Sequence, residues 1–140
     1  PNPGEALKPL VKIASGGELS RIVLALKAVL SKTKSLETLI FDEVDAGIGG
    51  ATSEKVGQKL KQLSKKHQVI CITHLAQIAK YAQNQFRISK NVINGRTFTT
   101  IVPLAEENAR IEEIARMIGG AHITDATLTH ARELLEQASS

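Results

Sequence analysis

The sequence has few of the residues that disulfides, zinc sites and base-stacking surfaces require. Cys71 is the only cysteine, so the chain can form no internal disulfide and has no Cys-x-x-Cys pair, which favours a reducing compartment, the cytoplasm. Tryptophan is absent, and one tyrosine and three phenylalanines offer few faces on which nucleic-acid bases could stack. No apolar run approaches the roughly 20 residues that span a bilayer, and the start of the chain lacks a signal-peptide pattern. We therefore expect neither a membrane protein nor a secreted one.

The chain has enough aliphatic residues for one domain. Its 140 residues are 42% hydrophobic, which suffices for a core of mostly aliphatic side chains. Eighteen basic residues against fourteen acidic ones give a net charge of +4, which permits an anionic partner without requiring one. Residues 1–14 hold three of the four prolines, so we interpret them as a connecting segment and residues 15–140 as a folded lobe of a longer protein.

A strand, a helix and a second strand follow one another in the middle of the chain. Residues 39–41 form an apolar run without alternation, which is typical of a strand covered on both faces. Residues 51–64 have the apolar spacing of a helix, and residues 69–72 form a second apolar run. This order predicts a parallel crossover unit. The inward positions of its helix would be Val56, Leu60 and Leu63.

An amphipathic helix is predicted to precede this unit and to end near residues 32–34. Its apolar residues recur at helical spacing, so we expect them to form one stripe that packs on the chain's own core. The members of this stripe are Leu19, Ile22, Val23, Leu26, Val29 and Leu30.

The second half of the chain contains the signals of a hairpin and two helices. Asn94-Gly95 lies between two β-rich stretches, residues 86–93 and 96–102, and this dipeptide suits a type I′ turn. A short helix is expected at residues 75–81. Two longer helices should follow, one closed by Gly119-Gly120 and one capped by Thr124 or Asp125.

Ser15-Gly16-Gly17-Glu18 opens the first predicted helix and allows two interpretations. The spacing is that of a capping box, with Ser15 at the N-cap and Glu18 three residues later. Two glycines in a first turn are nevertheless unfavourable, at roughly 1 kcal/mol each relative to alanine. Glycines there leave backbone N–H groups uncovered at the positive end of the helix, where a phosphate can bind. The pattern alone does not decide between cap and phosphate site.

Asp42-Glu43 and His74 each follow a predicted buried strand. The carboxyl ends of neighbouring parallel strands lie at one edge of a sheet, which is where ligands of open α/β sheets bind. The acids could instead cap the next helix, and a histidine after a strand is usually structural. A histidine that faces an Asp-Glu pair on one edge is nonetheless a candidate catalytic site.

Three strings in this order resemble the carboxyl-terminal half of an ABC-type ATPase head. They are SGGELSR at residues 15–21, LIFDEVDAGIGG at residues 39–50 and ITHLAQIA at residues 72–79. Within that superfamily the sequence is most similar to the bacterial SMC-like DNA repair proteins, over nearly the whole chain. The resemblance implies a P-loop NTPase fold of the ABC and SMC type, with a small, mainly parallel sheet, flanking helices and an appended β-hairpin.

The resemblance implies that Ser15, Gly16 and Gly17 form the signature motif. In such ATPases this motif grips the γ-phosphate of ATP that is held by the opposite head. Glu18 belongs to the same string and is counted with the nucleotide-binding residues.

For the acids and the histidine, the resemblance implies roles in ATP hydrolysis. Asp42 would be the Walker B acid that helps to hold Mg²⁺ through its water shell, and Glu43 would orient or deprotonate the attacking water. His74 would be the switch histidine that contacts the γ-phosphate. Asp45 would be the D-loop residue at the interface between two heads. These tasks are positioning and charge stabilisation, as phosphoryl transfer requires.

One element of the family is missing from these residues. No G-x-x-x-x-G-K-[ST] loop occurs, so the backbone cradle and lysine that bind the β- and γ-phosphates must come from elsewhere. We therefore expect the partners to include the amino-terminal half of the same head, which carries that Walker A loop, a second head and DNA. The chain alone is expected to be inactive.

The predicted function is that of an SMC-like ATPase in recombinational repair of DNA double-strand breaks, associated with the nucleoid. Alternatives are a head segment of another SMC-like chromosome or recombination ATPase, or a non-catalytic module for dimerisation or DNA docking.

Other chemistry-bearing residues have ordinary interpretations: Cys71 as a core residue, the remaining histidines as surface residues or caps, and the lysines of helix 51–64 as a solvated face. The histidines are His67, His122 and His130, and the lysines with their neighbours are Lys59, Lys61, Lys65 and Lys66. A DNA contact by these lysines, or by Arg87, Lys90 and Arg96 of the hairpin, stays open.

Overall fold

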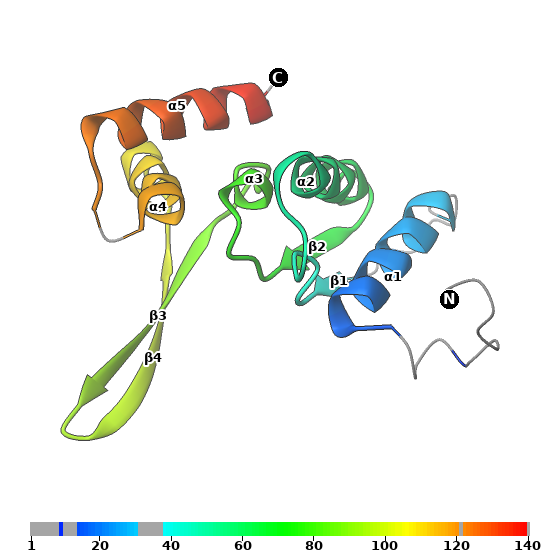
Figure 1. Cartoon of the computed structure of the whole chain (residues 1–140), viewed down its shortest axis with the longest axis horizontal. Coiled ribbons are helices and arrows are strands. Elements are labelled where there is room, and N and C mark those ends of the chain that lie inside the picture. Colours follow the sequence, from blue (N-terminus) through cyan, green and yellow to red (C-terminus); the bar gives the residue numbers. More distant parts are fainter. Residues whose placement is uncertain (1–8, 10–13, 31–37, 121, 140) are drawn as a thin grey trace.

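A computed structural model of the chain describes residues 9, 14–30, 38–120 and 122–139. Figure 1 shows helix α1 at one end of the molecule, helices α4 and α5 at the other, and a hairpin that extends away from both. The elements in chain order are α1 (Gly16–Leu30), β1 (Thr38–Phe41), α2 (Gly50–Ser64), β2 (Gln68–Cys71), α3 (Ala76–Ala79), β3 (Phe86–Ile93), β4 (Arg96–Pro103), α4 (Glu107–Gly119) and α5 (Asp125–Ser139). The predicted connecting segment, residues 1–14, and the predicted end of the first helix lie almost entirely outside the described residues.

Strands β1 and β2 form a parallel pair that is joined by helix α2, as predicted. Their register runs from Thr38 opposite Gln68 to Phe41 opposite Cys71, so both strands end at the same edge. The predicted inward side of α2 is confirmed, because Val56, Leu60 and Leu63 are buried. The apolar core of this unit comprises Leu24, Phe41, Val44, Val56, Leu60, Leu63 and Ile78.

The prediction that the first strand is covered on both faces is wrong for the described part of the chain. Ile40 is 67% exposed, and Ile70 of the neighbouring strand is 45% exposed. Helix α2 packs against one side of the pair, and the described residues provide no second layer. An apolar run indicates that a strand needs cover, but it does not say which chain segment supplies it.

The prediction that the apolar stripe of α1 packs on the chain's own core is also wrong. Leu26 is 55% exposed and Val29 is 75% exposed. The buried side of α1 instead contains Gly17 and Leu24, with Arg21 partly buried between them. At about 100° per residue these positions lie on the face opposite to the stripe. The face with Gly17, Arg21 and Leu24 therefore meets the core, and the face with the predicted apolar stripe is exposed.

The hairpin β3–β4 is confirmed, including its turn. Asn94 and Gly95 both have positive φ, 51° and 74°, as a type I′ turn requires. Large apolar side chains on both strands are exposed, among them Phe86, Ile88 and Ile101.

The two carboxyl-terminal helices pack on each other and on α3. Their shared core consists of Ala76, Ile111, Ile114, Ala115, Ala131 and Leu134. Gly120, with φ 70°, closes α4 as predicted. Of the two predicted caps of α5, Thr124 is the one observed, because its Oγ1 accepts a hydrogen bond from the Thr127 N–H at 3.3 Å.

Two of the ordinary interpretations need correction. His67, expected at the surface or as a cap, is only 8% exposed, and neither ring nitrogen has a hydrogen-bond partner among the described residues. It lies in the turn between α2 and β2, where its N–H donates to the carbonyl of Leu63, and this turn places it inside. Lys61 is not simply solvated, since its Nζ donates to the carbonyl of Ala138 at 2.6 Å and so joins α2 to α5. His122 and His130 are exposed, as expected.

Candidate functional site

Ser15 begins helix α1 with the predicted capping box. The Ser15 N–H donates to Glu18 Oε2 at 2.8 Å, and the Glu18 N–H donates to Ser15 Oγ at 3.4 Å. Hydrogen bonds from the Ser15 backbone and side chain lower the pKa of the exposed Glu18 carboxyl. The cap is therefore real, and it ties the Glu18 carboxylate to the start of its own helix.

Gly16 and Gly17 differ in what surrounds them. A Cβ at Gly17 would lie 2.8 Å from the carbonyl oxygen of Glu43 and 2.8 Å from the Cβ of Ala46, so this position needs glycine for close approach. A Cβ at Gly16 would meet only the Oε2 atom of Glu43, the movable end of an exposed side chain, at 2.7 Å. Packing thus accounts for Gly17. The start of α1 lies directly on the loop that follows β1.

Asp42 and Glu43 are both exposed at the carboxyl end of β1. The Asp42 carbonyl accepts a hydrogen bond from Ser20 Oγ at 2.9 Å, which fastens this loop to α1. Glu43 has φ 57°, in the left-handed region, where a residue other than glycine is disfavoured by about 1 kcal/mol or more. The surrounding contacts hold this backbone conformation and present the Glu43 carboxylate next to Gly16.

Asp45 is buried, at 4% exposure, and its Oδ2 atom is the centre of a small network. It accepts hydrogen bonds from Thr73 Oγ1 at 2.5 Å and from the His74 N–H at 2.9 Å. The His74 Nδ1 atom lies 3.0 Å from the same oxygen. Burial is the largest influence on the Asp45 pKa and raises it, but the hydrogen bonds and the neighbouring imidazole together lower the pKa below its ordinary value.

A role for Asp45 inside its own chain was not predicted. The place predicted for it, at an interface between two heads, stays a prediction, and its carboxylate is buried against Thr73 and His74 of its own chain. The residues that follow β1 and β2 do come together as predicted. The contact is made between Asp45 and His74. His74 itself is exposed and makes its described polar contacts with that residue.

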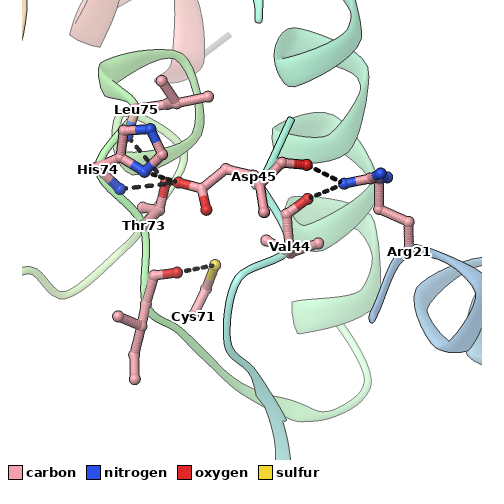
Figure 2. Close-up of polar contacts among 9 residues, drawn as sticks. Arg21, Val44, Asp45, Cys71, Thr73, His74 and Leu75 are labelled. Atoms are coloured by element: carbon pink, nitrogen blue, oxygen red, sulfur yellow. Dashed lines mark hydrogen bonds and ion pairs between the residues drawn. The ribbon is translucent and has the colours of Figure 1, made fainter. Parts of the chain in front are cut away.

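Arg21 anchors the other side of the same loop. Its Nη1 donates to the carbonyls of Val44 at 3.2 Å and Ala46 at 2.8 Å, on either side of Asp45 (Figure 2). Figure 2 also shows the Asp45 carboxylate directed to Thr73 and His74, away from Arg21. Sequence reasoning missed Arg21 and Thr73. The available signal was that Arg21 follows Gly17 by four residues and so shares its helix face.

Cys71 is confirmed as a residue packed against the core. Burial, followed by the negative charges of Asp45 and Asp42, raises the pKa of its thiol to about 12. At neutral pH such a thiol carries almost no thiolate, the reactive form.

The site therefore gathers three kinds of group at one sheet edge. They are the start of α1, the exposed carboxylates of Asp42 and Glu43, and the exposed imidazole of His74 held by Asp45. Within the described residues no group of three or more histidine, cysteine, aspartate or glutamate side chains could hold a metal ion. The arrangement suits an anionic ligand that brings its own cation, since helix N-termini bind phosphates and a carboxylate can share a metal with them.

Comparisons with known proteins identify the relatives of this chain. It is 47% identical over 139 residues to the DNA repair protein RecN of Halalkalibacterium halodurans, which covers 99% of the chain and 24% of that protein. It is 46% identical over 137 residues to RecN of Bacillus subtilis, with 98% and 24% covered, and 49% identical over 134 residues to RecN of Deinococcus radiodurans, with 96% and 23% covered. No protein-family model matches. The chain thus spans about a quarter of the length of these relatives.

A solved structure supports the predicted fold class. It comes from work on the ATP-driven dimerisation and DNA-stimulated activation of SMC ATPases, and it matches 85% of this chain and 70% of its own with a TM-score of 0.52. At 22% sequence identity the likeness concerns the fold alone. The α/β fold of an SMC-type ATPase head is therefore confirmed, and the sequence resemblance is to RecN in particular. No helix in the described ranges has both the length and the apolar character to cross a membrane.

Proposed function

We propose, on the premise of this similarity to RecN, that the chain is the carboxyl-terminal lobe of an SMC-like ATPase head that acts in recombinational repair of DNA double-strand breaks. Residues 15–140 would form the lobe and residues 1–14 a connecting segment. The higher identity to RecN than to the SMC structure favours this function over that of another SMC-like ATPase. The complete protein would work in the cytoplasm, on the nucleoid, where its DNA lies.

The observation that carries the proposal is the convergence of three motifs at one sheet edge. Gly17 lies against the loop that bears Asp42 and Glu43, and Asp45 of that loop holds His74. A non-catalytic module would account for the packing of Gly17 and for carboxylates near a helix N-terminus, which interact favourably with the helix dipole. It would not account for the left-handed backbone of Glu43, which lies with its carboxylate next to Gly16, or for the attachment of the exposed His74 ring to the buried Asp45.

In this function the residues of the chain would serve two nucleotides. Ser15 and Gly16, with Gly17 and Glu18 behind them, would meet the γ-phosphate of ATP bound to a second head. Toward the nucleotide of its own head, Asp42 would contribute one carboxylate to the shell of Mg²⁺, Glu43 would orient or deprotonate the attacking water, and His74 would contact the γ-phosphate. Asp45 would lie close to the second head while its carboxylate holds His74.

The residues present fit a magnesium nucleotide. Mg²⁺ usually keeps several waters and takes one or two carboxylates plus the phosphates of its substrate, so a single exposed Asp42 is an adequate protein ligand. When bound, the ion neutralises charge that develops on the phosphates. The phosphate-binding lysine would come from the amino-terminal half of the same head. DNA would be the further partner of the complete protein.

The test is Glu43→Gln in the complete protein, because it removes a carboxylate while keeping the side chain's shape. ATP hydrolysis should fall by about 100-fold, as removal of a general base commonly does, while ATP binding persists. ATP-bound paired heads should then accumulate in size-exclusion chromatography. Glu112→Gln, an exposed carboxylate on α4, is the matched control and should hydrolyse ATP normally. Full turnover in Glu43→Gln would exclude the catalytic role of Glu43.

A further inference from the structure

His74 combines an exposed ring with a fixed attachment at one of its nitrogens. Its side chain is 74% exposed, yet Nδ1 lies 3.0 Å from Asp45 Oδ2, in a residue that is 4% exposed. The backbone N–H of His74 donates to the same oxygen at 2.9 Å. The backbone N–H and the ring Nδ1 of His74 therefore both contact one buried atom, Asp45 Oδ2.

The Asp45 carboxylate is itself held from several sides. Thr73 Oγ1 donates to its Oδ2 at 2.5 Å, and this hydroxyl in turn accepts from the Leu75 N–H at 3.1 Å. Arg21 fixes the carbonyls of Val44 and Ala46, which flank Asp45 in the chain. An acceptor that is buried and bonded in this way cannot turn to follow a moving ring, so it imposes its position on the ring.

A carboxylate can only accept hydrogen bonds, and this determines where the proton of the imidazole lies. To bond Asp45, the Nδ1 atom of His74 must carry the proton, because two acceptors at 3.0 Å would repel each other. In the neutral ring the proton on Nδ1 leaves Nε2 without one. The hydrogen bond of one ring nitrogen thus decides the chemistry of the other.

We infer that Asp45 is a positioning residue for His74: it holds the ring through the Nδ1 proton and presents Nε2 as the atom that meets a ligand. The consequence for catalysis rests on the proposed function. If His74 contacts the γ-phosphate, it does so through Nε2, which accepts a hydrogen bond from a water or a protonated phosphate oxygen when the ring is neutral and donates one when both ring nitrogens carry protons. Asp45 then acts on the nucleotide of its own head through His74.

The direct test is the proton position in the ring, measured by nitrogen NMR on histidine-labelled chain at a pH where the imidazole is neutral. The signals of His74 are assigned by their loss in His74→Gln. In the unsubstituted chain the Nδ1–H form should exceed the Nε2–H form by about tenfold, which is the size of effect expected of one hydrogen bond to a charged group. In Asp45→Ala the preference for Nδ1–H should disappear.

Controls separate positioning from general loosening of the loop. Thr73→Val removes a different hydrogen bond from the same Asp45 oxygen and should leave the Nδ1–H form dominant. If Asp45→Ala does not fold, Asp45→Asn keeps an acceptor without the charge and should show a smaller preference than the unsubstituted chain. A dominant Nε2–H form in the unsubstituted chain, or a ratio that Asp45→Ala does not change, would overturn the inference.

The complete protein gives the second readout. Asp45→Ala should lower the rate of ATP hydrolysis by about tenfold, and adding it to His74→Ala should cost nothing more, because both act through one ring. Additive losses would overturn the positioning role in catalysis. A complete protein that hydrolyses no ATP would instead refute the proposed function. The NMR experiment would still test, independently of that function, whether Asp45 sets the proton position in the His74 ring.

Discussion

Asp45 shows, at the scale of a single residue, how a buried carboxylate can stabilise a fold. Burial alone would raise its pKa, yet the hydrogen bonds from Thr73 and the His74 N–H, with the nearby imidazole, lower the pKa below its ordinary value. A carboxyl with a depressed pKa in the folded state contributes stability that is fully present above its unfolded pKa. That contribution is lost as the pH falls through the lower, folded value.

We expect Asp45→Asn to destabilise the chain at pH 7 and to matter less in acid. At pH 7 the free energy of unfolding should fall by about 1–3 kcal/mol, the cost of leaving buried donors without a charged acceptor. As the pH falls below the ordinary range of an aspartate and through the lower, folded pKa, the native carboxyl also becomes protonated, so the difference between the two proteins should shrink. Urea unfolding at pH 7 and at a series of acidic pH values measures this. A constant difference for Asp45→Asn would contradict the linkage.

At the scale of elements, helix α1 has two faces with different tasks. The face with Gly17, Arg21 and Leu24 lies on the loop after β1 and on the core, while the apolar stripe on the other side is exposed. Gly17 sets how closely the helix can approach, since its missing Cβ leaves room for the Glu43 carbonyl.

Alanine at the two glycines should therefore have opposite effects. Gly17→Ala places a Cβ 2.8 Å from a backbone oxygen that cannot move away freely, so the free energy of unfolding should fall by roughly 1–3 kcal/mol. Gly16→Ala meets only a movable carboxylate oxygen and gains helix propensity, so stability should be unchanged or rise by up to about 1 kcal/mol. Thermal and urea unfolding of both variants measure the contrast. Equal losses in the two would show that the close approach at Gly17 is not the cause.

The elements that were predicted correctly are those whose signals are local. The turn at Asn94-Gly95, the cap at Ser15 and the inward side of α2 each depend on residues within a few positions of one another. Asp42 and His74 were placed at one edge because parallel strands impose it. The burial of His67, the buried face of α1 and the bonds of Arg21 depend on segments distant in sequence, and periodicity carries no information about these.

At the scale of the whole molecule, three apolar surfaces are open in the described part of the chain. They are the stripe of α1, the outer face of β1 and β2, and the exposed side chains of the hairpin, represented by Leu26, Ile40 and Ile88. Exposed apolar area of this extent is uncommon in a monomer that works alone. The relatives are about four times longer, and in the proposed function the amino-terminal half of the head would cover the stripe and the sheet.

The chain alone should release no phosphate from ATP above background, because it has no phosphate-binding loop. Mixing it with the separately produced amino-terminal half of the same head should restore hydrolysis and reduce the binding of a hydrophobic dye. The same mixture with Glu43→Gln chain should regain the reduced dye binding but not the hydrolysis. Phosphate release by the chain alone, abolished in Glu43→Gln, would contradict this prediction.

The two hydrogen bonds of Arg21 tie α1 to the loop after β1, so we expect the two to move as one piece. In a pair of proposed heads, α1 of one chain would face the nucleotide of its neighbour, while the loop would serve the nucleotide of its own head. One rigid piece would then touch both nucleotides, so the first to bind would adjust the second site before the second arrives. ATP binding to the pair would be cooperative, with a Hill coefficient above one, and loss of the Arg21 side chain would make the two sites independent.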